Sequence, residues 1–378
     1  MQELRSGGSG LKAWPVLGIV VIQGLLFSAH WFIYHTLIAF SGGVGAAASQ
    51  ALGDVLFVMS LSFVAAALLG FYSANWLVTA LYRIAAVWLG LLNFFFLAAL
   101  LCWVAGALLS LLGASGGKPQ IEATLFALAL IAGVYGLVNA RTIHIRRAII
   151  KLPGLPASWR GRTALVLSDT HLGHVNGPAF IRRIVAQAAR LSPDIILLPG
   201  DIFDGSKAEV EALAIPLGGL NPAIGSYFVT GNHDEFGDTA HYAEVLTNLG
   251  ICVLDNEMVT VEGLQIAGVS YGSTSPIRLQ ATLQGFHVDP DRASILLNHV
   301  PTHLPIVEQA GISLQISGHT HAGQIFPFTW FTRRAFGKFT CGLQQFGALQ
   351  VFTSSGAGTW GPPMRVGTRS EMALLTFE

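Results

Sequence analysis

The sequence is poor in charged residues and in cysteine. Only 11% of its 378 residues are Asp, Glu, Lys or Arg, while 52% are hydrophobic; an average soluble domain has roughly 25% charged residues. This composition excludes a disordered chain and is not expected of a wholly soluble one. The three cysteines form no CxxC pair, which argues against a disulfide scaffold and against a cysteine zinc site. Lys plus Arg and Asp plus Glu are equal at 21 each, so no overall basic field attracts nucleic acid.

The few charges are unevenly distributed along the chain. Residues 1–140 hold 7 charged side chains, whereas residues 141–378 hold 35. Four apolar stretches lie at about 14–40, 54–73, 85–112 and 123–140. Each is close to the roughly 20 residues that a membrane-spanning helix needs, and none has the polar face of a helix in a soluble bundle. We therefore predict a four-helix transmembrane region over residues 1–140.

Basic residues beside these stretches indicate a topology. Four spans place both ends of the region on one side, and only Lys118 falls on the other side. The first side collects seven Lys or Arg residues: Arg5, Lys12, Arg83, Arg141, Arg146, Arg147 and Lys151. By the positive-inside rule we predict an integral protein of a bacterial-type inner (plasma) membrane, with both termini and the C-terminal domain in the cytoplasm. Residues 141–160 are predicted as a basic juxtamembrane linker.

Residues 161–378 alternate between strand and helix patterns. Short apolar runs predict buried strands, and helical spacing appears between them, for example over Pro178–Leu191. The strands that matter most are predicted at 163–168, 194–198, 226–229, 294–297 and 314–316. Alternating strands and helices predict an α/β domain with helices covering the sheet.

Each of these five strands is followed directly by metal-binding residue types. In chain order they are Asp169-Thr170-His171, Gly200-Asp201 with Asp204, Gly231-Asn232-His233-Asp234, Asn298-His299 and Gly318-His319-Thr320-His321. Ligand sites in such sheets lie beyond the carboxyl ends of the strands. Carboxylate, imidazole and amide groups without thiolates suit divalent metal ions. Glycines before Asp201, Asn232 and His319 allow tight turns and close backbone approach.

Five motifs occur in a fixed order along the sequence: D-x-H, G-D-x-x-D, G-N-H-D, a single His and G-H-x-H. With this order, about residues 160–378 resemble the calcineurin-like metallophosphoesterases. The segments 315–325 and 355–365 are similar to its membrane-associated branch, which includes YkuE/YaeI-like proteins, transmembrane proteins with a metallophosphoesterase domain and some UDP-2,3-diacylglucosamine hydrolases. Ala322 stands where that branch usually has Gly. The resemblance implies a four-layer αββα sandwich with two mixed sheets and a site for two divalent metal ions (Mn, Fe, Zn or Mg).

The resemblance also implies a role for each matched residue. The first ion would be held by Asp169, His171 and His321, the second by Asn232, His299 and His319, and Asp201 would bridge them. A metal-activated hydroxide would attack phosphorus, His233 would bind the phosphate and protonate the leaving group, and Asp234 would orient His233. Asp204 is expected either to support a ligand or to cap a turn. His174 lies outside the matched motifs and is expected to be a surface or loop histidine.

The function expected from these features is hydrolysis of a phosphodiester or pyrophosphate bond by a membrane-anchored enzyme. The segment Phe326–Thr340 interleaves six aromatic side chains with three cations. Such a segment either dips into a membrane or packs its rings on the core; exposure beside the metals would favour a lipid-linked substrate such as UDP-2,3-diacylglucosamine. Two alternatives stay open. A nuclease of the same fold is disfavoured by the nearly neutral charge of residues 141–378, and a non-catalytic metal-binding sensor or scaffold would be expected to lack a ligand.

Overall fold

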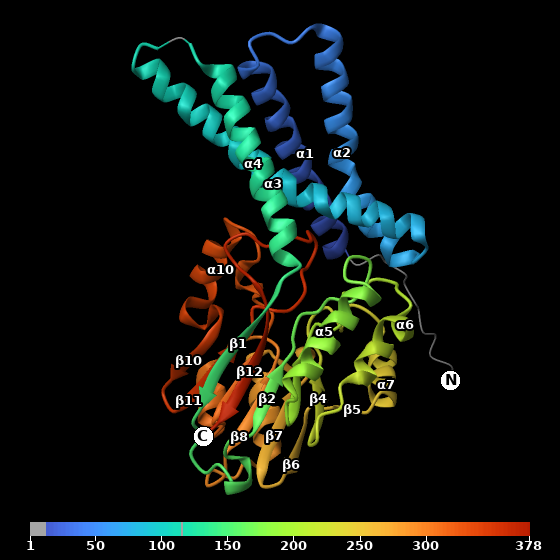
Figure 1. The fold of residues 1–378 in the computed structure, drawn as a ribbon, viewed down its shortest axis with the longest axis vertical. Coiled ribbons are helices and arrows are strands. Elements are labelled where there is room, and N and C mark those ends of the chain that lie inside the picture. The colour runs from blue at the N-terminus through green and yellow to red at the C-terminus, as the bar shows by residue number, and fades with distance from the viewer. Residues whose placement is uncertain (1–12, 115) are drawn as a thin grey trace, which may run out of the picture. The chain divides into compact units, whose positions relative to one another are not determined.

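The computed structural model describes residues 13–114 and 116–378 (Figure 1). The chain divides into two compact units. The first unit contains the described residues up to Leu69 together with Ile84–Ala132, and the second contains Gly70–Arg83 together with Gly133–Glu378. Arg5 and Lys12, which enter the topology prediction, lie outside the described residues.

Four long helices occupy the N-terminal part of the chain. They are α1 (Ala13–Phe40), α2 (Ala46–Tyr72), α3 (Trp76–Leu111) and α4 (Lys118–Ala140). Each is long and apolar enough to cross a membrane, with a mean hydropathy of 2.0 to 2.4 over its most apolar windows. In lipid, polar side chains need partners within the protein. The indole of Trp103 accordingly donates to Thr36 Oγ1 at 2.9 Å, and that hydroxyl donates to the carbonyl of Phe32.

The second and third helices begin earlier than the apolar stretches predicted from the sequence. The single charged residues Asp54 and Arg83 lie inside α2 and α3 and do not end them. The break between these helices falls at residues 73–75, where Asn75 Oδ1 accepts from the backbone N–H of Val78. An Asn that accepts from the third residue onward is a helix N-cap. The start of α3 is therefore set by a cap rather than by charge.

The second unit is built on two six-stranded mixed sheets. The first sheet has the order β1 (Ile143–Ile150), β12 (Ser370–Phe377), β2 (Thr163–Val166), β3 (Ile195–Pro199), β4 (Gly225–Val229) and β5 (Ile251–Val253). The second has the order β10 (Gly342–Phe346), β11 (Leu349–Thr353), β9 (Leu314–Ser317), β8 (Ser294–Asn298), β7 (Leu264–Val269) and β6 (Glu257–Val261). Pairing is parallel through β2–β5 and through β7–β8–β9–β11, while β12–β2, β6–β7 and β10–β11 pair antiparallel.

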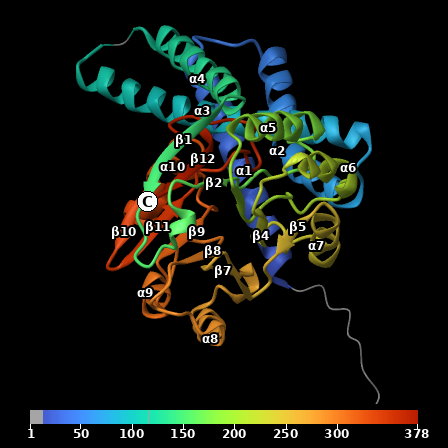
Figure 2. The same cartoon turned by 60° about the horizontal axis from the view of Figure 1, so that its bottom comes forward.

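Helices cover the outer face of each sheet (Figure 2). The first sheet carries α5 (Pro178–Leu191), α6 (Val210–Ala214) and α7 (Thr239–Asn248), and the second carries α8 (Pro276–Phe286) and α9 (Leu304–Gln309). Successive side chains of a strand point to opposite faces of its sheet, so the buried strands supply apolar residues to both faces. On β2, Ala164 and Val166 join the core between the sheets, whereas Leu165 joins the core under α5. The predicted four-layer αββα sandwich is thus confirmed.

Residues 141–160, predicted as a linker, contribute a strand to the first sheet. β1 pairs in parallel with β12 along its whole length, from Ile143 opposite Ser370 to Ile150 opposite Phe377. Ile143 and Ile145 pack against the core under α5, and Ile150 enters the core between the sheets. Apolar and basic residues alternate only over residues 143–146, and the adjacent Arg146 and Arg147 give the segment the charge pattern of a linker as well.

The last turns of α4 belong to the second unit and join the loop before β12. The carbonyl of Gly136 accepts from the N–H of Arg365 at 3.0 Å, and Asn139 Nδ2 donates to the carbonyls of Arg365 and Thr368 at 2.9 Å each. A Cβ on Gly136 would lie only 2.8 Å from Val366 Cγ2. Glycine therefore allows this close approach of helix and loop.

Candidate metal centre

The carboxyl ends of strands from both sheets meet at one site. Loops after β2, β3 and β4 supply residues from the first sheet, and loops after β8 and β9 supply residues from the second. Five of the predicted ligands have left-handed backbone angles, with φ between 45° and 69°: Asp169, His171, Asp201, His319 and His321. Non-glycine residues rarely adopt this conformation, and it clusters at functional sites. The strand ends thus turn sharply to aim these side chains inward.

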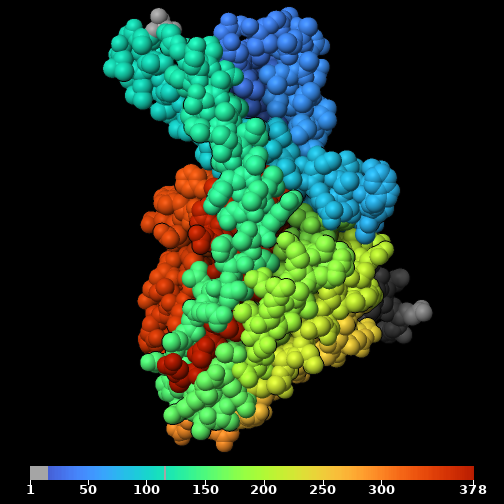
Figure 3. Space-filling view, in the orientation of Figure 1, coloured from blue at the N-terminus to red at the C-terminus, as the bar shows by residue number. Residues whose placement is uncertain are grey.

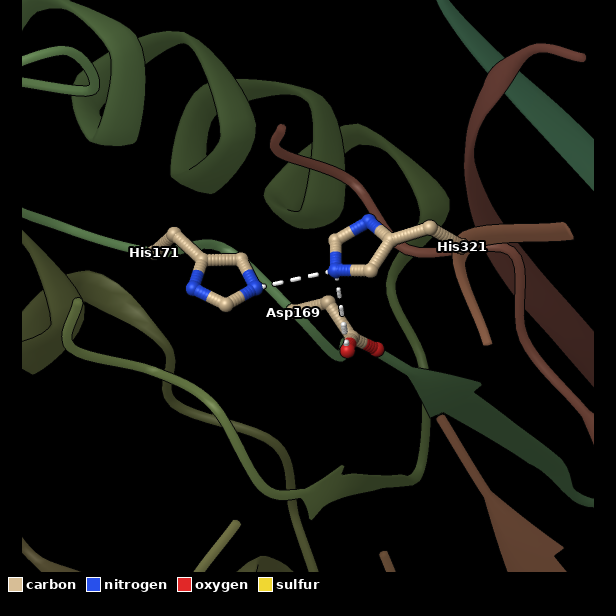
Figure 4. Close-up of side chains that lie close together, drawn as sticks. All are labelled: Asp169, His171 and His321. Carbon is tan, nitrogen blue, oxygen red and sulfur yellow. Dashed lines mark hydrogen bonds and ion pairs between the residues drawn. The ribbon is translucent and has the colours of Figure 1, made fainter. Parts of the chain in front are cut away.

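Asp169, His171 and His321 form the first cluster (Figure 4). Nε2 of His171 lies 2.9 Å from Nε2 of His321, and the latter lies 3.5 Å from Asp169 Oδ1. Each of the three residues has at most 9% of its surface exposed. Three potential ligand atoms from two sheets therefore converge in a site nearly closed to solvent.

Asp201, His299 and His319 form a second cluster. Nδ1 of His299 lies 2.7 Å from the carbonyl of Pro199 and donates to it, which leaves Nε2 to face Asp201 Oδ2 at 3.2 Å. An outer hydrogen bond of this kind fixes the ring orientation of metal-ligating histidines. Asn232 Oδ1 lies 2.9 Å from Nδ1 of His319, which brings the predicted amide ligand to the same cluster.

Asp201 links the two clusters. Its Oδ2 lies 3.7 Å from Nε2 of His171 as well as near His299, and it also groups with His171 and His233. The other carboxylate oxygen, Oδ1, accepts from the N–H of His233 at 2.8 Å. A Cβ on Gly231 would collide with the Asp201 carboxylate, so the glycine predicted at this turn is required by the close approach. The donor set of carboxylates and imidazoles fits divalent metal ions.

Burial and neighbouring charges shift the pKa values of the four histidines in different directions. Burial lowers the pKa of His171 to about 3 and that of His319 to about 4, with His299 adding repulsion in both cases. Burial also lowers the pKa of His321. For His299 burial acts the same way, but the charge of Asp201 outweighs it and raises the pKa to about 9. Near neutral pH three of the imidazoles are therefore uncharged and able to ligate, whereas His299 must release a proton.

His233 and Asp234 lie beside the clusters but do not interact as predicted. Nδ1 of His233 bonds at 3.1 Å to the backbone carbonyl of Asp204 and not to Asp234. The buried Asp234 carboxylate instead accepts from the backbone N–H groups of Asp201, Gly231 and Phe203 at 2.7, 2.9 and 2.9 Å. Its oxygens are directed to the loop backbone, so the orienting group for His233 is a backbone carbonyl. Asp234 holds together the turns that carry Asp201 and Asn232.

The carboxylate of Asp204 caps a turn. Its Oδ1 accepts from the backbone N–H of Ser206 at 2.8 Å and from the hydroxyl of the same residue. The sequence left open whether this residue supports a ligand or caps a turn. The side chain does the second, while the backbone carbonyl contacts His233.

Arg365 is a buried cation that the sequence argument did not single out. Its guanidinium is fully buried and donates to the carbonyls of His321, Ser355, Gly356 and Gly358 at 2.7 to 3.2 Å. One of its nitrogens lies 3.3 Å from Nδ1 of His321. The sequence offered one signal, because Arg365 ends the segment 355–365 that resembles the membrane-associated branch.

His174 lies in a loop, one of the two expected places, but it is buried rather than at the surface. Only 3% of it is exposed, and its ring stacks on Tyr82 with a centroid distance of 5.2 Å. Arg83 Nε donates to the backbone carbonyl of His174 at 2.7 Å. The loop that carries His171 is thus joined to the turn between α2 and α3, which belongs to the same unit.

Comparison with known proteins matches the calcineurin-like phosphoesterase family over residues 162–323. The chain is 34% identical over 286 residues to the transmembrane protein with metallophosphoesterase domain of Danio rerio and 30% identical over 301 residues to the Bos taurus protein of that name. It is 29% identical over 270 residues to the uncharacterized metallophosphoesterase YkuE of Bacillus subtilis. These alignments cover 70%, 74% and 67% of this chain and 64%, 67% and 93% of the three relatives, so the chain spans slightly less than two thirds of the first.

The family match begins just before β2 and ends just after His321, so it contains all the strand ends that carry the predicted ligands. Four membrane-length helices precede it, as the names of two of the relatives lead one to expect. The chain therefore belongs to the calcineurin-like metallophosphoesterases, a family of metal-dependent phosphoesterases.

Proposed function

We propose that the protein is a membrane-anchored phosphohydrolase that uses two metal ions to cleave a phosphodiester or pyrophosphate bond. The position of Asp201 carries this proposal. One of its oxygens lies between His299 of one cluster and His171 of the other, at 3.2 and 3.7 Å from their Nε2 atoms. A carboxylate shared by two histidine clusters is the arrangement that a bridging ligand requires. Every position of the ligand set implied by the sequence is also filled, which disfavours the sensor or scaffold.

Each matched residue has a place in this proposal. Asp169, His171 and His321 would hold one ion, and Asp201 would bridge it to the other. The second ion would be held by Asn232, His299 and His319. When bound, the pair of ions would polarise the phosphoryl group and lower the pKa of a bound water. The buried residues would exclude bulk water, which strengthens these electrostatic effects.

His233 is the proposed proton donor for the leaving group. Its Nδ1 donates to the carbonyl of Asp204 at 3.1 Å, so Nε2 is the nitrogen left to carry the proton for the leaving oxygen. Its backbone N–H is held by Asp201. The imidazole is thus oriented at the edge of both clusters, with Nε2 free to exchange a proton with a leaving oxygen.

Exposed aromatic rings near His233 favour a substrate with an apolar part. Phe236 and Trp360 lie 5.0 and 5.5 Å from the His233 ring, centroid to centroid, and are 62% and 58% exposed. Large exposed rings beside a polar centre are typical of binding surfaces. We propose that they contact the apolar part of a lipid-linked phosphate, with UDP-2,3-diacylglucosamine as the specific candidate.

The proposed location is a bacterial-type inner membrane, with the phosphoesterase domain in the cytoplasm. The distribution of Lys and Arg supports the cytoplasmic side. The bonds of Arg83 and Asn139 within the second unit support a common side for the α2–α3 turn, the end of α4 and the phosphoesterase domain.

A substrate panel tests the activity. The full-length protein is assayed with Mn²⁺, Fe²⁺, Zn²⁺ or Mg²⁺ on bis-p-nitrophenyl phosphate, UDP-2,3-diacylglucosamine, phospholipids, cyclic nucleotides and DNA. We expect hydrolysis of the chromogenic diester and a higher kcat/KM on one lipid-linked substrate. Asp201→Asn should lower kcat at least about 10³-fold, since bridging two ions contributes several kcal/mol. Asp289→Asn, which changes an exposed carboxylate paired with Arg292, is the matched control.

The outcomes separate the alternatives. Preference for DNA would support the nuclease, and a folded protein that is inactive with every metal would support the scaffold. The lipid part has its own test. Phe236→Ser with Trp360→Ser should leave bis-p-nitrophenyl phosphate hydrolysis unchanged and impair the lipid substrate, because both rings are more than half exposed beside His233. Equal loss on both substrates would contradict a lipid-specific role.

A further inference from the structure

A large cavity opens on the flank of the second unit, where the edge strands of the two sheets come together. β1 and β10 are the edge strands on this flank, and α10 (Phe328–Phe336) with the following turn covers the space between them. The orange surface of α10 and β10 lies beside the green surface of β1 in Figure 3. The cavity has a volume of about 1080 Å³. Ala322, next to His321, lines it, but none of the predicted metal ligands does.

Positive charge dominates the lining of this cavity. Arg146, Arg333, Lys338 and Arg369 line it, against the single carboxylate of Glu371. Both oxygens of Glu371 are occupied, because Oε2 lies 2.8 Å from Arg146 Nε and Oε1 accepts from the N–H of Ser355 at 3.0 Å.

Two of the cations have no partner of their own. Among residues 13–114 and 116–378, the side chains of Arg333 and Arg369 form no hydrogen bond or ion pair. Lys338 Nζ donates to the carbonyl of Gln345 at 2.7 Å, which holds it at the rim without neutralising it. Two unpaired guanidinium groups facing one cavity fit an anion with several oxygens, such as a phosphate.

The helix that covers the cavity has an exposed apolar side. Phe328, Trp330 and Phe331 are 55%, 61% and 54% exposed, so the rings do not pack on the core. Arg333 and Arg334 follow on the same short helix. Aromatic rings next to arginines are what an interfacial helix presents to a bilayer, with the rings among the acyl chains and the cations at the headgroups.

The wall of the cavity is connected directly to a membrane-length helix. Thr368 lines the cavity, and its carbonyl accepts from Asn139 Nδ2 in the last turn of α4. His144 also lines the cavity, from β1 opposite Glu371 of β12, and it follows the end of α4 at Ala140 by four residues. An extended chain spans at most about 3.6 Å per residue. His144 therefore lies within about 15 Å of the end of α4, and a membrane-spanning helix ends near the phospholipid headgroups.

We propose that this cavity binds the phosphate-bearing headgroup of an anionic phospholipid of the host bilayer, with the aromatic side of α10 inserted in the interface. Arg333 and Arg369 contact the phosphate, Lys338 lies at the rim, and the acyl chains leave along Trp330 and Phe331. The site is separate from the metal ligands, so the proposal stands whether or not the proposed phosphohydrolase activity is found.

Lipid binding tests the proposal directly. The full-length protein in maltoside micelles is titrated with fluorescent phosphatidylglycerol and, separately, with fluorescent phosphatidylcholine, and binding is followed by anisotropy. We expect saturable binding of phosphatidylglycerol and at least about tenfold weaker binding of phosphatidylcholine. Arg333→Gln with Arg369→Gln should weaken phosphatidylglycerol binding about tenfold or more, since each removes a charge-assisted contact. Arg160→Gln with Arg190→Gln removes two exposed arginines that do not line the cavity and should bind as the wild type does.

Competition then separates a lipid from a free anion. Glycerol 3-phosphate at the same concentration should displace little phosphatidylglycerol, because it lacks the acyl chains that contact α10. Trp330→Ser with Phe331→Ser should weaken phosphatidylglycerol binding and leave weak glycerol 3-phosphate binding unchanged. Any of three results would overturn the proposal. They are equal binding of both phospholipids, phosphatidylglycerol binding by the Arg333/Arg369 double variant that equals that of the wild type, and full displacement of phosphatidylglycerol by glycerol 3-phosphate. A thermal melt of every variant confirms that the comparison is between folded proteins.

Discussion

Thr79 and His174 are hydrogen-bonded although 95 residues separate them in the chain. Thr79 Oγ1 lies 3.0 Å from Nδ1 of His174, and the carbonyl of Gly70 lies 3.1 Å from its Nε2. A neutral imidazole protonated on Nε2 satisfies both bonds, donating to Gly70 and accepting from Thr79. The turn between two membrane-length helices thereby holds the loop that carries His171.

Breaking this contact should loosen the metal centre. Thr79→Val keeps the shape of the side chain but leaves a buried imidazole nitrogen without its donor, which costs about 1–3 kcal/mol. With Arg83→Gln added, we expect a lower unfolding temperature and metal binding weakened about three- to tenfold, measured by titration calorimetry. Ser28→Ala, which removes a hydroxyl bonded only to Gly24 within α1, should change neither quantity. A lower unfolding temperature with unchanged metal affinity would show that the contact stabilises the fold without positioning His171.

Asp234 should matter for stability more than for proton transfer. Its carboxylate accepts from three backbone N–H groups. In Asp234→Asn the amide NH₂ would face at least one of these donors and leave it unpaired, so we expect a loss of about 2–4 kcal/mol and weaker metal binding. His233→Gln should instead lower kcat by about 10²–10⁴ with little change in unfolding temperature. Thermal melts beside steady-state kinetics distinguish the two. A stable Asp234→Asn variant with the pH profile of the His233 variant would restore the role first predicted for Asp234.

Much of the fold could be predicted from the spacing of apolar residues and from the residue types that follow each strand. The strands before Asp169, Asp201, Asn232, His299 and His319 are short apolar runs, and all five form where predicted. β1 was missed because Arg146 and Arg147 interrupt its apolar residues, and a basic segment after a membrane span also has the composition of a linker. β10 was not assigned because only Leu343 and Phe346 of its five residues are large apolar ones. Its place is decided by pairing with β11, which a single sequence does not show.

The composition of the site was easier to predict than its connections. The seven proposed ligands all meet at one place because parallel strands end together. The partners of Asp234 could not be predicted, because the motif GNHD shows only which residues are its neighbours in sequence. The Asp234 carboxylate accepts from the backbone N–H groups of Asp201 and Phe203, which lie about 30 residues earlier in the chain. Burial of His174 depends on residues 70–83, which the sequence assigns to the membrane region.

Arg365 should be irreplaceable by another cation. Its planar guanidinium serves four carbonyls around His321, and the lysine ammonium has only three donors on a flexible stem. Arg365→Lys should therefore destabilise the second unit by about 2–4 kcal/mol and reduce activity, because the carbonyls of the loop after β11 lose their partners. Arg160→Lys, at an exposed position in the same unit, is the matched control. Equal unfolding temperatures for the two lysine variants would contradict this structural role.

Metal removal should expose a pH dependence that the bound metal hides. The charge of Asp201 raises the pKa of His299 to about 9 despite the opposing effect of burial, whereas its ordinary value is 6.5. The folded protein without metal therefore binds this proton more tightly than the unfolded chain does. The stabilisation is fully present below pH 6.5 and is lost as pH rises through about 9. Its size is on the order of 3 kcal/mol at most.

In EDTA the unfolding temperature of the protein should therefore fall between pH 6.5 and pH 9, and His299→Gln should flatten this fall. Saturating Mn²⁺ should reverse the slope, because a metal ion competes with the proton for Nε2 and binds more tightly as pH rises. Calorimetry in two buffers of different ionisation enthalpy should detect proton release on metal binding at pH 7.5, and less release in His299→Gln. A metal-free protein whose stability is flat or rises over this range would show that His299 is not protonated beside Asp201. Metal binding would then release no proton from this residue.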